Sequence, residues 1–165
     1  MAQDTEKGTA AGKDRNVPTI DPGEVRPGEH VGRVPIRVRY AETDAQAIVY
    51  HSNYLIYFEV GRTDWVKATG TSYRDLEERG HALVIAESHL RFLASASYDD
   101  RLVIETRLVE LRTRSCTFAY RVLRQDAENE VIVEGWTALV SIGPDRKVVP
   151  IPDDLAGAMR DLAAL

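Results

Sequence analysis

Hydrophobic and polar residues alternate over residues 34–40, and this period of two predicts a strand with one buried face. The polar segment that follows, residues 41–51, has no period and predicts a loop. From Ser52 or Asn53, either of which can cap a helix, apolar residues recur at steps of three and four until Gly70. The pattern therefore predicts one long helix of about 17 residues.

After Gly80 the period changes to two and stays there, which is typical of a run of strands. The four long strands that it predicts cover residues 83–93, 102–111, 115–124 and 130–142. In the last of these strands both faces are apolar, so we expect it to lie in the interior of the sheet. Shorter elements complete the chain: a helical turn over 72–79, a short strand over 148–151 and a terminal helix over 152–162.

The predicted order of elements is a strand, a long helix and then four antiparallel strands. This order is typical of an α+β domain with a single sheet. Strands of about ten residues reach roughly 33 Å and the helix reaches about 25 Å, so the sheet must curl around the helix to bury it. The expected fold is one long central helix wrapped by a curved antiparallel sheet. The edge strands of such a sheet are unpaired, and a symmetric copy usually covers them. We therefore expect a homodimer or a homotetramer.

The first 33 residues lack this periodicity and are rich in Gly, Pro, Thr and charged residues. Such a segment cannot bury enough apolar surface to offset the entropy lost on ordering. We expect residues 1–33 to form a flexible N-terminal extension and residues 34–165 to form the folded domain.

Composition narrows the possible functions further. The chain has 165 residues, 44% of them hydrophobic, and a formal net charge of -5. This length and composition fit one globular domain, and the acidic balance argues against nucleic acid as a partner. The start of the chain does not resemble a secretory signal, and no apolar run approaches the roughly 20 residues of a membrane span. We expect a cytoplasmic protein with no membrane span.

Most of the polar residues to which the predicted fold gives no role lie in the loop before the long helix. The first backbone N–H groups of a helix have no partner within the helix, so they can hold a carbonyl oxygen that is becoming an oxyanion. Asp44 in this loop could act as a base or nucleophile, and His51 as a proton donor or polar clamp. Together these groups suggest acyl transfer. A turn cap at Asp44 and a surface histidine at position 51 are the structural alternatives.

The spacing of residues 40–59 resembles a known signature. These residues read Tyr-x-Glu-Thr-Asp-x-x-x-x-Val-Tyr-His-x-Asn-Tyr-x-x-Tyr-Phe-Glu, which resembles the hotdog-fold acyl-CoA thioesterases of the 4-hydroxybenzoyl-CoA thioesterase type. The later segments 98–106, 118–122, 134–140 and 149–152 resemble the later strands of that family in the same order. The resemblance covers about residues 34–155, and it implies a hotdog fold that binds its substrate between two subunits.

The resemblance also implies a reaction, the hydrolysis of an acyl-CoA thioester to the free acid and CoA. It places the catalytic carboxylate at Asp44, acting as nucleophile or as base for water, and the carbonyl oxygen at the backbone N–H near His51. The His51 side chain would assist, and Tyr40 would line the site. Our candidate substrate-binding residues are Ser52, Asn53 and Glu59; Glu59 could instead act as a base or pair with Arg62. We expect no metal and no cofactor.

The sequence departs from the pattern of the family at two places. Many relatives carry Gly at the position of Ala47, where a Cβ costs about 1 kcal/mol or more if the backbone is left-handed. Residues 94–96 are Ala-Ser-Ala where relatives commonly place Pro.

A hotdog hydratase or dehydratase, or a non-hydrolytic module that binds acyl-CoA or acyl carrier, could share the fold. The sequence does not identify the acyl group.

Overall fold

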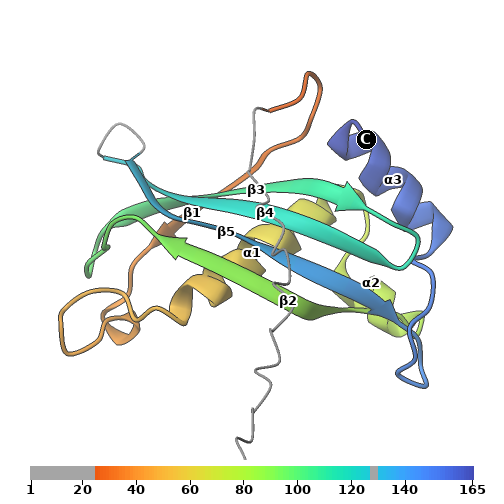
Figure 1. Cartoon of the computed structure of the whole chain (residues 1–165), viewed down its shortest axis with the longest axis horizontal. Coiled ribbons are helices and arrows are strands. Elements are labelled where there is room, and N and C mark those ends of the chain that lie inside the picture. Colours follow the sequence, from red (N-terminus) through yellow and green to blue (C-terminus); the bar gives the residue numbers. More distant parts are fainter. Residues whose placement is uncertain (1–24, 127–129) are drawn as a thin grey trace, which may run out of the picture.

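A computed structural model describes residues 25–126 and 130–165, which form an antiparallel sheet with helices beside it (Figure 1). In chain order the elements are β1 (Gly32–Arg37), the 3-10 helix η1 (Tyr40–Glu42), α1 (Asn53–Lys67), α2 (Tyr73–Glu78), β2 (Ala82–Phe92), β3 (Arg101–Leu111), β4 (Ser115–Arg124), β5 (Glu130–Ile142) and α3 (Asp153–Ala163). The α+β class is as expected, and the four long strands fall within a residue or two of the predicted ranges.

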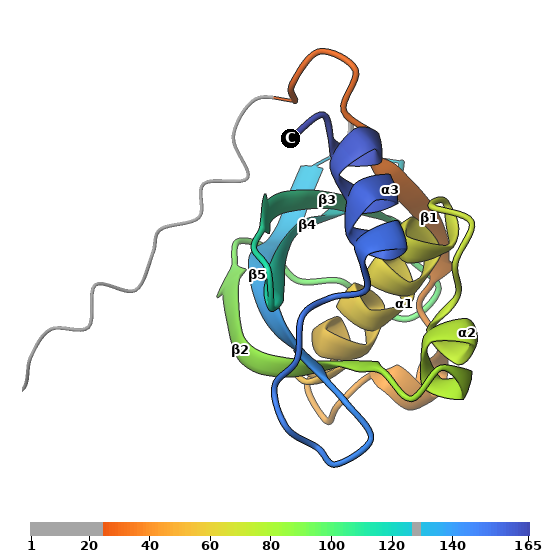
Figure 2. The ribbon, with the colours of Figure 1, turned by 90° about the vertical axis from the view of Figure 1, so that its right-hand side faces the viewer.

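The described strands form one five-stranded sheet in the order β1-β3-β4-β5-β2, and every neighbouring pair is antiparallel. β5 lies between β4 and β2, which confirms that the strand with two apolar faces is interior. β1 and β2 are the two edges. The sheet curves, and α1 lies on its concave side (Figure 2).

The buried stripe of α1 packs against the middle of the sheet. Phe58 stacks on Tyr120 of β4 with ring centroids 4.1 Å apart, and Trp65 meets the edge of Phe118 at 5.3 Å. Both α1 side chains are fully buried. Cys116 on β4 is buried too, and burial raises the pKa of its thiol to about 12, so it serves as a small core residue rather than a nucleophile.

The flexible extension expected over residues 1–33 is wrong for its last nine residues. Gly32 and Arg33 already belong to β1, and the N–H of His30 donates to the carbonyl oxygen of Leu162 in α3. The carboxylate of Glu29 is buried 2.8 Å from the guanidinium of Arg107 on β3. Periodicity does not predict this segment, because the residue that is buried in it is charged. Glu29 is buried only because it pairs with Arg107, far along the chain. Residues 1–24 lie outside the described residues.

Two other boundaries differ from the predictions. The first strand ends at Arg37, and Tyr40 lies in η1, because the Glu42 side chain accepts a hydrogen bond from the Arg39 N–H and tightens the chain into a turn. The short strand expected over 148–151 is reduced to a single bridge between Val148 and Ile142.

No helix among the described residues combines the length and hydrophobicity needed to cross a membrane.

Candidate active site

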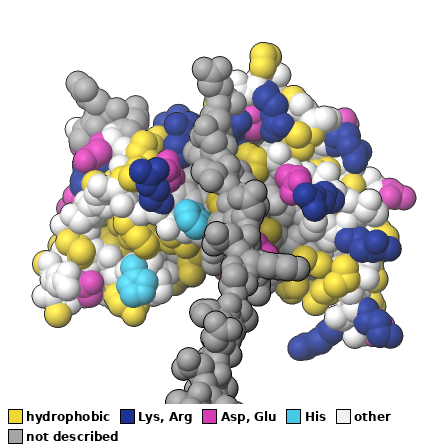
Figure 3. Space-filling view, viewed as in Figure 1, with side chains coloured by type: hydrophobic (Ala, Val, Ile, Leu, Met, Phe, Trp, Pro, Cys, Tyr) yellow, Lys and Arg dark blue, Asp and Glu magenta, His cyan; other side chains and the backbone are white. Residues whose placement is uncertain are grey.

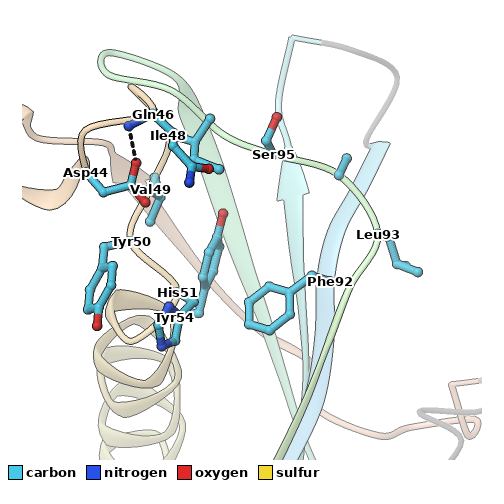
Figure 4. A pocket seen from close by; sticks show the side chains of 11 residues that line it. Asp44, Gln46, Ile48, Val49, Tyr50, His51, Tyr54, Phe92, Leu93 and Ser95 are labelled. Carbon is cyan, nitrogen blue, oxygen red and sulfur yellow. Dashed lines mark hydrogen bonds between the residues drawn. The ribbon is translucent and has the colours of Figure 1, made fainter.

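A cavity of about 530 Å³ opens beside the N-terminus of α1 (Figure 4). One wall is the loop from Asp44 to His51, and the other is the end of β2 with the segment that follows it. Tyr54 from the first turn of α1 and Phe92 from β2 meet edge to face across it, with ring centroids 5.7 Å apart. The cavity is thus apolar on its inner walls and polar at Asp44 and His51.

The Asp44 loop is closed by hydrogen bonds from its own backbone. The N–H of Asp44 donates to the Ile48 carbonyl at 2.9 Å, and the N–H of Ala47 donates to the Asp44 carbonyl at 2.9 Å. The Oδ1 atom of Asp44 accepts a hydrogen bond from the Gln46 N–H at 2.8 Å, drawn as the dashed line in Figure 4. Within the described residues, Oδ2 has no hydrogen-bond partner. One oxygen of the carboxylate is therefore fixed and the other is free to act on a ligand.

The start of α1 leaves two backbone donors open. The N–H of Tyr50 donates to the Glu42 carbonyl, and that of Asn53 donates to the Tyr50 carbonyl. In the part of the chain that the structure describes, the N–H groups of His51 and Ser52 between them have no hydrogen-bond partner. Ser52 stands at the N-cap position, yet its side chain makes no capping hydrogen bond. The arrangement leaves these amides able to bind an oxygen that carries negative charge.

The structure brings two of the six predicted site residues to the cavity, Asp44 and His51. Tyr40 is 77% exposed, packs on Tyr98 with ring centroids 5.6 Å apart, and does not line the cavity. The side chain of Asn53 donates to the Glu42 carbonyl at 2.8 Å, so it supports the loop. Ser52 and Glu59 do not line the cavity either. Glu59 is exposed and pairs with Arg62 at 3.2 Å, which is the alternative role that the sequence suggested for Glu59.

Sequence reasoning missed Glu42, although it lies in the motif. Its carboxylate is buried and accepts hydrogen bonds from the Arg39 N–H at 2.7 Å, the Arg39 guanidinium at 2.8 Å and the Tyr57 hydroxyl at 2.9 Å. Burial by itself raises the pKa of a carboxyl group, but the hydrogen bonds from Arg39 and Tyr57 outweigh it and lower the pKa of Glu42. The spacing of three between Arg39 and Glu42 was the available signal.

Sequence reasoning also missed the aromatic walls of the cavity. Tyr54 falls on the apolar steps of the predicted helix and within the signature over residues 40–59, and Phe92 falls in a predicted strand, but neither was predicted to line the site. Burial raises the pKa of Tyr54 to about 12, so its hydroxyl is a weaker acid than that of an exposed tyrosine. No local signal pairs Tyr54 with Phe92, because 38 positions separate them along the chain.

The curved antiparallel sheet, the helix on its concave side and the cavity beside Asp44 are together those of a hotdog-type thioesterase. Residues 38–159 match the sequence profile of the thioesterase-like superfamily. This match covers most of the chain, and the chain belongs to that superfamily.

Individual relatives and solved structures agree. The chain is 32% identical over 112 residues to the acyl-CoA thioester hydrolase YbgC of Escherichia coli O6:H1, which covers 68% of this chain and 82% of that protein. It is 30% identical over 131 residues to the acyl-CoA thioesterase YbgC of Haemophilus influenzae, covering 78% and 93%. The crystal structure of the DHNA-CoA thioesterase from Staphylococcus aureus is similar with a TM-score of 0.77 and 27% identity, covering 82% of this chain and 92% of that one.

Proposed function

We propose that this protein hydrolyses an acyl-CoA thioester to the free acid and CoA. The observation that carries the proposal is that the Asp44 carboxylate and His51, whose N–H is one of the two open amides at the start of α1, line one cavity. The names of the Escherichia coli and Haemophilus influenzae relatives support the same reaction. The sheet curled around α1 is the central-helix arrangement of the hotdog fold.

In this mechanism the thioester carbonyl oxygen accepts hydrogen bonds from the N–H groups of His51 and Ser52. These donors stabilise the negative charge that develops on the oxygen, and the loss of one such donor typically costs about 3 kcal/mol or more. Asp44 then either attacks the carbonyl carbon, to form an anhydride that water later cleaves, or takes a proton from the water that attacks. In both cases the carbon–sulfur bond breaks and CoA leaves as the thiolate. The His51 side chain lies beside the carbonyl and assists.

The substrate site is completed by a second copy of the chain. Among the described strands β2 pairs only with β5, and its exposed side chains include the apolar residues Val84, Ile85 and Phe92. Hydrophobic side chains are exposed along the lower part of the view in Figure 3, where β2 lies in Figure 1. Phe92 and the neighbouring Leu93 also line the cavity. A partner at this edge would cover the apolar strand and close the cavity, in a dimer or a tetramer located in the cytoplasm.

The decisive experiment measures thiol release from acetyl-CoA, palmitoyl-CoA and benzoyl-CoA. We expect the wild-type protein to hydrolyse at least one of these, and Asp44→Asn to retain its fold and oligomeric state while kcat falls at least 100-fold, because the amide is neither a nucleophile nor a base. Asp64→Asn is the matched control, since Asp64 is exposed on α1 and does not line the cavity. Near-normal turnover by Asp44→Asn would remove Asp44 from the mechanism.

The same preparation separates the two rival functions. A hydratase would add water to an enoyl-CoA and release no thiol. A binding module would retain acyl-CoA, release no thiol and be indifferent to Asp44→Asn. Either result would replace the proposed hydrolysis.

A further inference from the structure

We propose that Glu42 is a positioning residue, which holds the Asp44 loop against the N-terminus of α1 and so fixes the carboxylate relative to the oxyanion donors. The catalytic part of this inference rests on the proposed hydrolysis. The structural part, that Glu42 joins the loop to the helix, stands on contacts within the described residues.

The carboxylate of Glu42 is the first half of this connection. It is 6% exposed and accepts hydrogen bonds from three groups, the Arg39 N–H, the Arg39 guanidinium and the hydroxyl of Tyr57. Tyr57 is itself 2% exposed and lies one helical turn into α1. A buried charge is costly unless it is paired and hydrogen-bonded, so this carboxylate occupies its place because its donors surround it. The side chain thus attaches η1 to the body of α1.

The backbone of Glu42 is the second half. Its carbonyl oxygen accepts the Tyr50 N–H at 2.9 Å and the side-chain amide of Asn53 at 2.8 Å. Tyr50 immediately precedes His51, and Asn53 is the first residue of α1. A bridge between Thr43 and Val49 closes the loop from the other side. One residue is therefore bonded to both ends of the segment that carries Asp44 and the open amides.

This geometry makes both reacting groups depend on Glu42. A single residue separates it from Asp44, and its carbonyl holds the residue next to His51. A displacement of Glu42 would change the distance between the carboxylate and the amides that hold the thioester. A misplacement of about 1 Å in an active site can reduce the rate by roughly 100-fold. Packing alone would not require a charged side chain here.

Amide hydrogen exchange tests the structural part without any substrate. In Glu42→Gln, the neutral side chain loses the charged pair with Arg39 and must place an NH₂ group among donors, so we expect exchange over residues 43–53 to be at least 10 times faster. Glu105→Gln is the matched control, because Glu105 on β3 is also nearly buried and paired with an arginine, Arg33 at 2.6 Å, but does not line the cavity. Equal exchange over residues 43–53 in the two variants would overturn the inference, whatever the activity.

Steady-state kinetics test the catalytic part. We expect Glu42→Gln to lower kcat about 10-fold or more at nearly constant KM on the acyl-CoA that the wild-type protein hydrolyses best. In an Asp44→Asn background the same change should lower kcat less than threefold, because the group that Glu42 positions is already gone. A full further loss in the double variant would mean that Glu42 does not act through Asp44. If the wild-type protein hydrolyses no acyl-CoA, the proposed function fails while the exchange result still decides the role of Glu42.

Discussion

Ala47 has a left-handed backbone, with φ of 60°, in the turn that closes the Asp44 loop. Its N–H donates to the Asp44 carbonyl, so the turn itself imposes this conformation. A side chain with a Cβ costs about 1 kcal/mol in this region, whereas glycine adopts it freely. The loop therefore contains backbone strain three residues from the proposed catalytic carboxylate.

We predict that Ala47→Gly raises the free energy of unfolding by about 0.5 to 1 kcal/mol, because the strain is relieved. Urea unfolding measures the change. Ala45→Gly in the same loop is the control; Ala45 has no left-handed backbone, so this change should leave stability equal or lower. If both glycine variants lose the same stability, Ala47 is not strained.

At the scale of elements, the contact between α1 and β3 sets how deeply the helix lies in the sheet. A Cβ added at Gly61 of α1 would clash with the Oγ1 atom of Thr106 and come within 3.0 Å of the Cγ2 atom of Ile104, both on β3. Both β3 side chains are fully buried and have no room to move aside. Gly61 therefore permits the close approach of the helix to the sheet.

We predict that Gly61→Ala lowers the free energy of unfolding by about 1 to 3 kcal/mol, because the added methyl group overpacks this contact. Thermal or urea unfolding measures it. Gly157→Ala on α3 is the control, because a Cβ there meets nothing within 4 Å and alanine favours a helix. The control should be neutral or more stable by up to about 1 kcal/mol. A Gly61→Ala protein as stable as Gly157→Ala would show that the approach is not tight.

At the scale of the molecule, β2 is an exposed edge of the described sheet. β2 has a run of exposed residues over positions 84–89, and its outer N–H and carbonyl groups face away from the sheet. Such an edge can pair with another chain. The proposed active site lies at the end of this strand, so assembly and catalysis are linked if a second copy pairs there.

We predict that Ile85→Glu halves the mass of the particle in light scattering, or reduces a tetramer to smaller species, because two copies would bring like charges together at the edge. Thiol release should fall at least 10-fold, while the circular dichroism spectrum keeps its shape, since Ile85 is 46% exposed within one chain. Leu165→Glu, at an exposed site far along the chain from β2, should leave the mass unchanged. An unchanged mass for Ile85→Glu would place the interface elsewhere.

Much of the fold was predictable because its signals are local. The alternation within β3, β4 and β5 and the three- and four-residue steps of α1 depend only on which face of each element is buried. The segment before β1 was not predictable, because Glu29 is buried through an ion pair with Arg107, 78 positions away. Tyr40 was expected at the cavity and lies outside it, because a hydrogen bond between Arg39 and Glu42 turns the chain.

The sequence by itself determined the elements and pointed to the segment that carries Asp44 and His51, because periodicity and motif spacing are properties of neighbouring residues. Only the tertiary structure decided that Phe92 forms the opposite wall of that cavity and that the Tyr57 hydroxyl meets Glu42. These contacts follow from the order of the strands and the curvature of the sheet around α1. Contacts between distant residues are set by how whole elements pack, and no local pattern specifies that packing.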